Sequence, residues 1–135
     1  MSGVRAATAR MEVSAENLAN QQTRGVLPGQ DATPPLKPNT TPIPKVYRPT
    51  KVNLYSLDQT GGGVGVQYRQ VTPGYYATYD PTAAYADQDG MVAAPAVDPA
   101  SEVVEQIQAS VHYRASLKAM QRLQDAEDSV LDIIA

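Results

Sequence analysis

The sequence predicts a mainly α fold with a small β region. N- and C-terminal helices are expected to pair as an antiparallel, coiled-coil-like hairpin around an irregular, proline- and glycine-rich middle that contains a β-hairpin. Two observations lead to this fold class. All 11 prolines lie between Pro28 and Pro99, and eight of the 9 glycines lie between Gly25 and Gly90. Apolar residues at helical spacing lie instead near the two ends of the chain, away from the residues that disrupt helices.

The same distribution divides the chain into three parts. Residues 1–22 are expected to form the N-terminal helix, residues 23–99 an extended middle segment with a β-hairpin at about 45–72, and residues 100–135 the C-terminal helix. A length of 135 residues is typical of one domain. The aromatic residues are 8 tyrosines without Phe or Trp, which argues against an ordinary globular core.

The N-terminal helix is predicted over residues 3–20. Val4, Met11 and Leu18 recur every seven residues, which is the spacing of a coiled-coil seam. Several alanines raise the helix propensity and allow another backbone to approach closely. Because an isolated helix of this length is marginal in water, we expect it to pack against the C-terminal helix.

The middle segment begins with an irregular, proline-rich stretch over residues 21–44, because proline is excluded from helix interiors and central strands. Residues 45–57 and 64–72 alternate in polarity and flank a glycine-rich turn, which predicts a β-hairpin. Residues 75–79 are a candidate third strand. Residues 91–99 are expected to be an extended approach to the last helix.

The C-terminal helix is predicted over residues 101–134, which contain no proline and no glycine and would span about 50 Å at 1.5 Å per residue. Ser101 is the expected N-cap. The apolar surface steps from one face around Ile107 to nearly the opposite face around Leu123, unlike the single stripe of a helix on one core. Two interpretations stay open: a long helix at the edge of an ordinary domain, or a helix whose neighbours change along its length and include other chains.

The two helices differ in how much apolar surface they offer. The N-terminal seam has three large side chains, whereas the C-terminal helix has eleven over more than one face. Each large side chain left in water forgoes roughly 1.5–3 kcal/mol of burial, so we expect copies of the chain to associate. The side chains expected to take part in helix packing are Val4, Met11, Leu18, Val104, Ile107, Val111, Leu117, Met120, Leu123 and Leu131. Those expected to satisfy backbone groups where the first helix ends are Asn17, Asn20 and Thr23.

Composition and charge argue against several classes of protein. A net charge of −3 with scattered basic residues disfavours a nucleic-acid partner. The absence of cysteine excludes disulfides and thiolate metal sites. No run approaches the ~20 apolar residues that span a bilayer, so we expect no direct membrane insertion. Arg5 and Arg10 interrupt the N-terminus, which therefore lacks the apolar core of a cleaved signal peptide.

Three motifs suggest chemistry, but a structural explanation is favoured for each. The run from Gly61 to Gly65 lacks the ending of a phosphate-binding loop and is better explained as a hairpin turn. Asp87 and Asp89 lack the later ligands of a calcium loop. His112 has no arrangement of partners typical of catalysis. We therefore expect no catalytic, metal or cofactor-binding residues and no enzyme activity.

Three stretches together resemble bacterial flagellar axial proteins, and most closely the FlgC family of proximal rod proteins. They are the run from Arg10 to Asn20 (RMEVSAENLAN) with Thr23; the motifs Tyr79 to Pro81, Ala86 to Asp87, Gly90 to Val92 and Pro95 to Asp98; and the run from Glu102 to Ser110 (EVVEQIQAS) through Tyr113 to Ile133. The matches occur in the order found in the family and bracket nearly the whole chain.

The resemblance implies a structural subunit whose terminal helices pair and stack into the inner tube of a helical assembly, with the middle segment outside the tube. Its partners would be other flagellar rod subunits, adjacent basal-body proteins and the flagellar type III export apparatus. Its location would be the basal body, where the rod crosses the periplasm and transmits torque, reached without a cleaved signal. The resemblance implies no cofactor.

Another interpretation of the residues is a small secreted or periplasmic binding module. Tyr75, Tyr76, Tyr79 and Tyr85 form a tyrosine-rich segment that could stack on sugar rings, although a small tyrosine-rich core or interface is the favoured explanation for them. An enzyme is the third interpretation, and no constellation of residues supports it.

Overall fold

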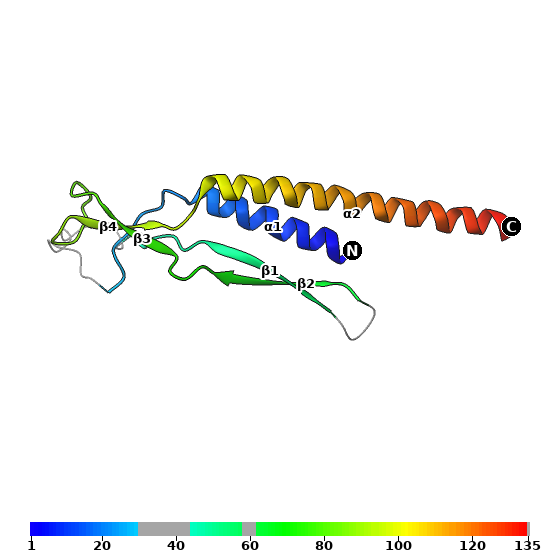
Figure 1. The fold of residues 1–135 in the computed structure, drawn as a ribbon, viewed down its shortest axis with the longest axis horizontal. Helices are drawn as coiled ribbons and strands as arrows, with labels where there is room; N and C mark the ends of the chain where they lie inside the picture. The colour runs from blue at the N-terminus through cyan, green and yellow to red at the C-terminus, as the bar shows by residue number, and fades with distance from the viewer. Residues whose placement is uncertain (30–43, 58–61, 135) are drawn as a thin grey trace.

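The structure is a computed structural model that describes residues 1–29, 44–57 and 62–134, with side chains described as far as residue 130. The predicted fold class, mainly α with a small antiparallel β region, is confirmed. The elements in chain order are α1 (Ser2–Ala19), β1 (Thr50–Ser56), β2 (Val64–Gln70), β3 (Tyr75–Tyr79), β4 (Met91–Pro95) and α2 (Pro99–Ile134). The molecule is elongated, with α1 and α2 side by side and the β1–β2 hairpin along α1 (Figure 1).

The two helices run antiparallel. Gly3, near the start of α1, lies against Ser116, whereas Ser14, near its end, contacts Glu102 at the start of α2. Because α1 has 18 residues and α2 has 36, the C-terminal half of α2 extends past the N-terminus of α1 (Figure 1). We call this part, residues 117–134, the α2 overhang. The heptad pattern of a coiled coil stays a prediction.

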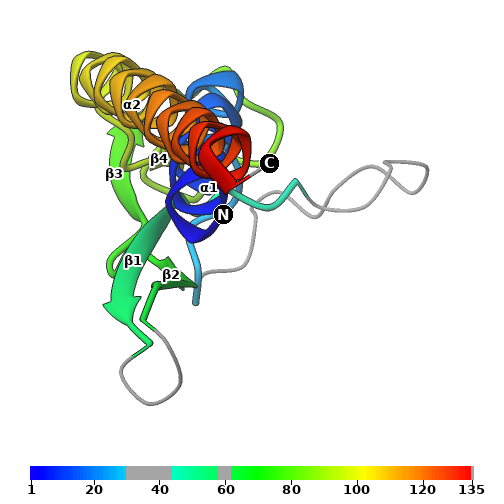
Figure 2. The same cartoon turned by 90° about the vertical axis from the view of Figure 1, so that its right-hand side faces the viewer.

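Helix α1 has neighbours on two sides. It lies between α2 and the β1–β2 hairpin and contacts both (Figure 2). The side chains of Val4, Met11 and Leu18, which the seven-residue spacing singled out, are half-buried. The predicted seam assumed that α2 is the only neighbour of α1. Because the hairpin also packs against α1, the most buried face of α1 differs from that seam. The buried residues of α1 are mostly small and are Ala6, Ala7, Ala9, Val13, Ser14 and Asn17.

The start of α2 differs from the sequence prediction. Pro99 is its first residue, and Asp98 caps it by accepting hydrogen bonds from the backbone N–H groups of Ala100 and Ser101, each at 3.3 Å. The prediction that Ser101 is the N-cap was therefore wrong. Proline suits the first helical position because its missing N–H would have had no partner there. The hydroxyl of Ser101 donates to Asp98 and lowers the pKa of that carboxyl, which keeps the cap ionised.

The predicted β-hairpin is present. Strands β1 and β2 pair antiparallel, from Thr50 opposite Gln70 to Ser56 opposite Val64. Part of its turn, residues 58–61, lies outside the described residues, as do residues 30–43 of the predicted irregular stretch. Gly65 is buried beneath the ring of Tyr55, its cross-strand neighbour, where a Cβ atom would have no room.

The second strand pair carries the most buried strand of the molecule. The candidate third strand is present as β3, and it pairs antiparallel with β4, which lies in the segment expected only to be an extended approach to α2. The other edge of β4 is covered because Gly25 exchanges backbone hydrogen bonds with Ala93 at 3.0 and 2.9 Å. Val26 in turn forms a parallel bridge with Lys45. The chain segments on either side of residues 30–43 therefore join this small sheet.

Candidate functional site

Asn17 lies where α1, β1 and α2 meet and is only 1% exposed. Its Oδ1 accepts a hydrogen bond from the backbone N–H of Thr50 at 3.0 Å, and its Nδ2 donates to the Thr50 carbonyl at 2.9 Å. The amide thus pairs with Thr50 as a neighbouring strand would. Nδ2 also donates to Glu102 Oε1 at 2.9 Å, and the hydroxyl of Tyr47 donates to Oδ1 at 2.8 Å. One side chain therefore connects three elements of the fold.

The electrostatic surroundings keep Tyr47 in the form that this network needs. Burial raises the pKa of the Tyr47 phenol, and the negative charges of Glu16 and Glu102 raise it further. The phenol therefore stays protonated and continues to donate to Asn17 at neutral and moderately alkaline pH.

Two further polar contacts connect the helices. Ser14 Oγ donates to the backbone carbonyl of Glu102 at 2.6 Å. Arg10 forms a bidentate ion pair with Glu105, with Nη2 2.9 Å from Oε2 and Nε bonded to Oε1. The hydrogen bond from Arg10 lowers the pKa of the Glu105 carboxyl, and the bond to Glu105 raises the pKa of the guanidinium. Both groups stay charged at neutral pH and hold the helices in one register.

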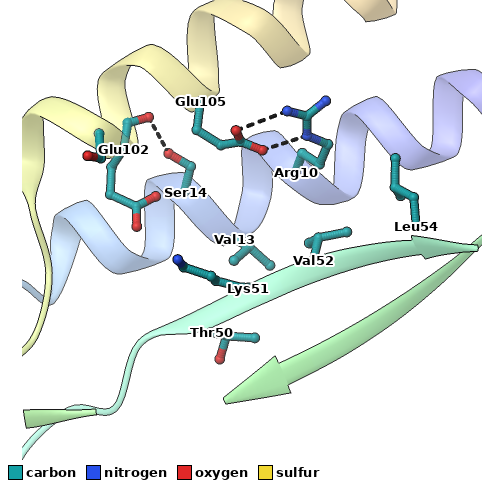
Figure 3. Close-up of a pocket in the computed structure, with 10 residues that line it drawn as sticks. Arg10, Val13, Ser14, Thr50, Lys51, Val52, Leu54, Glu102 and Glu105 are labelled. Carbon is teal, nitrogen blue, oxygen red and sulfur yellow. Dashed lines mark hydrogen bonds and ion pairs between the residues drawn. The ribbon is translucent and has the colours of Figure 1, made fainter. Parts of the chain in front are cut away.

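A cavity of about 400 Å³ adjoins this junction between α1, β1 and the start of α2. Figure 3 shows Val13, Val52 and Leu54 on one side of it and the Arg10–Glu105 pair on the other. Of the polar groups that line it, Arg10, Ser14, Glu102 and Glu105 are engaged in contacts between elements, and the described part of the chain contains no cluster of side chains able to hold a metal ion. The junction is thus suited to fixing elements relative to one another.

Most of the predicted packing residues of α2 are not covered by α1, because Val104, Ile107 and Val111 lie on the opposite face and Leu123 lies beyond the N-terminus of α1. The side chains of α2 that lie toward α1 are polar or small and include Glu102, Glu105, Ala109 and Ser116. Met120 is half-buried, and the side chain of Leu131 lies outside the described residues. The large predicted residues are exposed by 51% for Val104, 59% for Ile107, 53% for Val111, 37% for Leu117 and 62% for Leu123. The structure therefore leaves an apolar surface on α2 that no described part of the chain covers.

The predicted polar residues lie at and beyond the end of α1. Asn20 Nδ2 donates to the carbonyl of Glu16 at 3.0 Å, and Thr23 Oγ1 donates to Asn20 Oδ1 at 3.3 Å. Asn17 instead contacts another element. Sequence reasoning missed Thr50 and Tyr47 as its partners. The contact to Thr50 could not be predicted from residue type, because it involves only backbone atoms of Thr50. The available signal was an asparagine inside a helix, which requires partners when it is buried.

Neither helix, over the described residues, has a stretch that is long and apolar enough to cross a membrane.

Comparison with known proteins gives three matches. The family model described as "Flagellar basal body rod FlgEFG protein C-terminal" matches residues 88–133. Similarity to the flagellar basal-body rod protein FlgC of Agrobacterium fabrum is 27% identity over 137 residues, covering 98% of this chain and 88% of the relative. Similarity to the protein of the same name from Aquifex aeolicus is 32% identity over 118 residues, covering 87% of this chain and 79% of the relative.

Proposed function

The chain belongs to the FlgC family of flagellar basal-body rod proteins, and we propose that it is a structural subunit of the proximal rod that assembles helically through its terminal helices. Many copies and their neighbours would then form a stiff shaft that transmits torque. The work of such a subunit is mechanical, and it depends on contacts between chains rather than on a reacting group.

The observation that carries this proposal is the apolar surface of α2. Val104, Ile107, Val111 and Leu123 are each more than half exposed, although they lie on a well-formed helix. Burying such side chains contributes roughly 1.5–3 kcal/mol each, so a surface of this size favours association. An assembly that covers α2 is the arrangement in which this helix becomes stable along its length.

The remaining parts of the chain take roles that follow from this arrangement. In the proposed assembly, residues 1–22 and 100–135 belong to an inner tube, and residues 23–99 lie outside it against neighbouring subunits. The partners are other rod subunits and adjacent basal-body proteins. Export occurs through the flagellar type III apparatus without a cleaved signal.

Replacing Leu123 with Asp tests the proposal. Leu123 is 62% exposed, so Leu123→Asp should leave the monomer folded and expressed while it abolishes rod assembly and swimming in cells that depend on this chain. Gln121→Asp is the matched control, because it adds the same charge at an exposed polar position two residues away. Normal swimming with Leu123→Asp would show that the surface of α2 does not serve assembly.

The alternative of a small binding module has less support in the geometry. Tyr76 and Tyr79 on β3 are exposed by 56% and 68%, as a stacking surface would require. Successive side chains of a strand point to opposite faces, so residues 76 and 79 lie on different faces of β3. They therefore do not form one platform for a sugar ring.

A further inference from the structure

One row of side chains runs along the whole of α2 on the side of α1. Its members recur at intervals of three, four or seven residues, which places them on one face of the helix. In its first half, Glu102 and Glu105 bond to α1, Ala109 is fully buried, and Ser116 lies against Gly3. Beyond Ser116, α1 has ended. The same row continues into the α2 overhang as Met120, Leu123, Glu127 and Val130, which we call the distal row.

The distal row is a continuation of the α1–α2 interface without its partner. Leu123 is 62% exposed and Val130 is 55% exposed, although both stand in line with residues that α1 covers. A helix placed end to end with α1 would cover them. No described segment of the same chain lies there (Figure 1).

A second row lies on the other side of α2 and nearer its start. It consists of Val104, Ile107, Val111, Arg114 and Lys118, again at alternating intervals of three and four, and we call it the proximal row. Its three apolar members are more than half exposed, because α1 packs against the opposite face of the helix. The two rows therefore point in opposite directions and lie toward opposite ends of α2.

Building on the proposed function, we propose that the distal row of one copy packs against the proximal row of the next copy. Both rows present large aliphatic side chains. Their charges are complementary, because the distal row contains Glu127 and the proximal row contains Arg114 and Lys118. When two copies join in this way, one copy still presents a free proximal row and the other a free distal row. The contact is therefore heterologous and generates an open helical filament instead of a closed dimer.

Self-pairing of either row is disfavoured by the same residues. If two distal rows paired, Glu127 of one copy would lie near Glu127 of the other. If two proximal rows paired, the Arg114 and Lys118 side chains of both copies would come together. Like charges at such distances oppose association. Either arrangement would also leave the other row exposed on both chains.

The test uses two full-length variants that each lose one row. Ile107→Asp removes the proximal row and Leu123→Asp removes the distal row, and both positions are exposed in the monomer, so folding should be retained. Sedimentation of the wild-type chain over a range of concentrations should show growth beyond dimers. Each variant alone should stay monomeric. An equimolar mixture should form heterodimers that grow no further, since only one intact pair of rows is available, and Gln121→Asp should behave as wild type.

The outcomes distinguish this contact from the broader function. Homodimers of Ile107→Asp would show that distal rows pair with each other and would overturn the proposal, while a structural role in the rod would stand. A wild-type chain that stays monomeric would also overturn it, and the rod function would then be judged by the swimming of Leu123→Asp cells alone.

Charge reversal gives a second measurement on the same contact. Glu127→Lys, or Arg114→Glu together with Lys118→Glu, should weaken association at least tenfold. Mixing a Glu127→Lys, Ile107→Asp chain with an Arg114→Glu, Lys118→Glu, Leu123→Asp chain should restore heterodimers, because the intact rows again carry opposite charges. Equal association of the matched and mismatched mixtures would contradict the proposed pairing of rows.

Discussion

At the residue scale, Asn17 makes more side-chain hydrogen bonds than any other residue in the described part of the chain. Its amide makes two hydrogen bonds to the backbone of Thr50, one to Glu102 and one to Tyr47, and all of them lie in a buried environment. Buried donors and acceptors that lose their partners cost more free energy than their bonds contribute. The orientation of the hairpin relative to the helices therefore depends on this one side chain.

Asn17→Asp tests this dependence with almost no change in shape. Asp keeps an acceptor for Thr50 N–H but cannot donate to the Thr50 carbonyl, and it places a second carboxylate beside Glu102. We expect the free energy of unfolding to fall by about 2–4 kcal/mol in urea titrations at pH 7. Glu102→Gln should restore part of the loss, because it removes the repulsion.

Asn20→Asp is the control for that measurement. Its side-chain bond to Glu16 is exposed, so its loss should change the free energy of unfolding by less than about 1 kcal/mol. An Asn17→Asp chain as stable as wild type would show that the network does not hold the hairpin.

The Arg10–Glu105 ion pair predicts a dependence on pH. The pKa of Glu105 is lower in the folded chain than its ordinary value of 4.5, so its contribution is complete above that value and is lost as the pH falls through the folded pKa. The side chain of Glu105 is 38% exposed, and water screens the pair. We expect Glu105→Gln to lower the free energy of unfolding by about 0.5–1 kcal/mol at pH 7.

Acidification should remove this difference between Glu105→Gln and wild type. Denaturant titrations at pH 7 and at a pH below the folded pKa of Glu105 provide the comparison, since the wild-type carboxyl is then neutral like the amide. A difference that persists unchanged in acid would mean that Glu105 contributes through packing instead of charge.

At the scale of elements, the sheet around β4 depends on a close crossing of backbones at Gly25. A Cβ atom there would lie 2.2 Å from the backbone nitrogen of Val46 and 2.4 Å from the carbonyl oxygen of Pro44. Main-chain atoms cannot move aside as a flexible side chain can. We expect Gly25→Ala to lower the free energy of unfolding by more than about 2 kcal/mol, measured by thermal and urea unfolding.

Gly3→Ala is the matched substitution in α1. Its added methyl group would meet only the hydroxyl of Ser116, which can rotate, and alanine favours the helix by about 1 kcal/mol over glycine. A neutral or stabilising effect is therefore expected there. If both variants lost a similar free energy of unfolding, the loss for Gly25→Ala would reflect a general intolerance of substitution and not the close backbone crossing at residue 25.

Most elements of this fold could be predicted from local sequence patterns, because their signals lie within a few residues. The alternation in residues 45–57 and 64–72 predicted the hairpin, and the lack of proline and glycine after residue 99 predicted α2. The cap at Asp98 was missed because Ser101 has an equally suitable side chain, and only the backbone path decides between them.

The candidate site was less predictable, because its contacts join residues far apart in the chain. Asn17 was expected to act on its own helix end, whereas it bonds to Thr50 and Glu102. Helix periodicity identifies apolar faces but does not say which face a neighbour takes. The interface between α1 and α2 uses Ala109 and charged residues, while Ile107 points away from it.

At the scale of the whole molecule, the α2 overhang is a long helix with few neighbours. Residues 121–130 are exposed throughout, whereas α1 covers residues 102–116 on one side. An unsupported helix of this length is marginal in water. We expect amide hydrogen exchange in dilute monomer to be fast in residues 121–130 and slower in residues 102–116, and to slow in the overhang once the chain assembles.

Mass spectrometry of the exchanging chain at low and high concentration would measure this difference between the two halves of α2. Strong protection of residues 121–130 at monomeric concentrations would contradict it, since the overhang would then need no partner.

The bonds between Asn17 and Thr50 have one more consequence. On the side of Thr50 they involve only the main-chain N–H and carbonyl, which every residue except proline has. Residue 50 can therefore be substituted, in evolution or by design, without loss of these hydrogen bonds, whereas Asn17 cannot. Foreign hairpins grafted between the helices should stay anchored at their first residue, making this protein a scaffold with an exchangeable outer module.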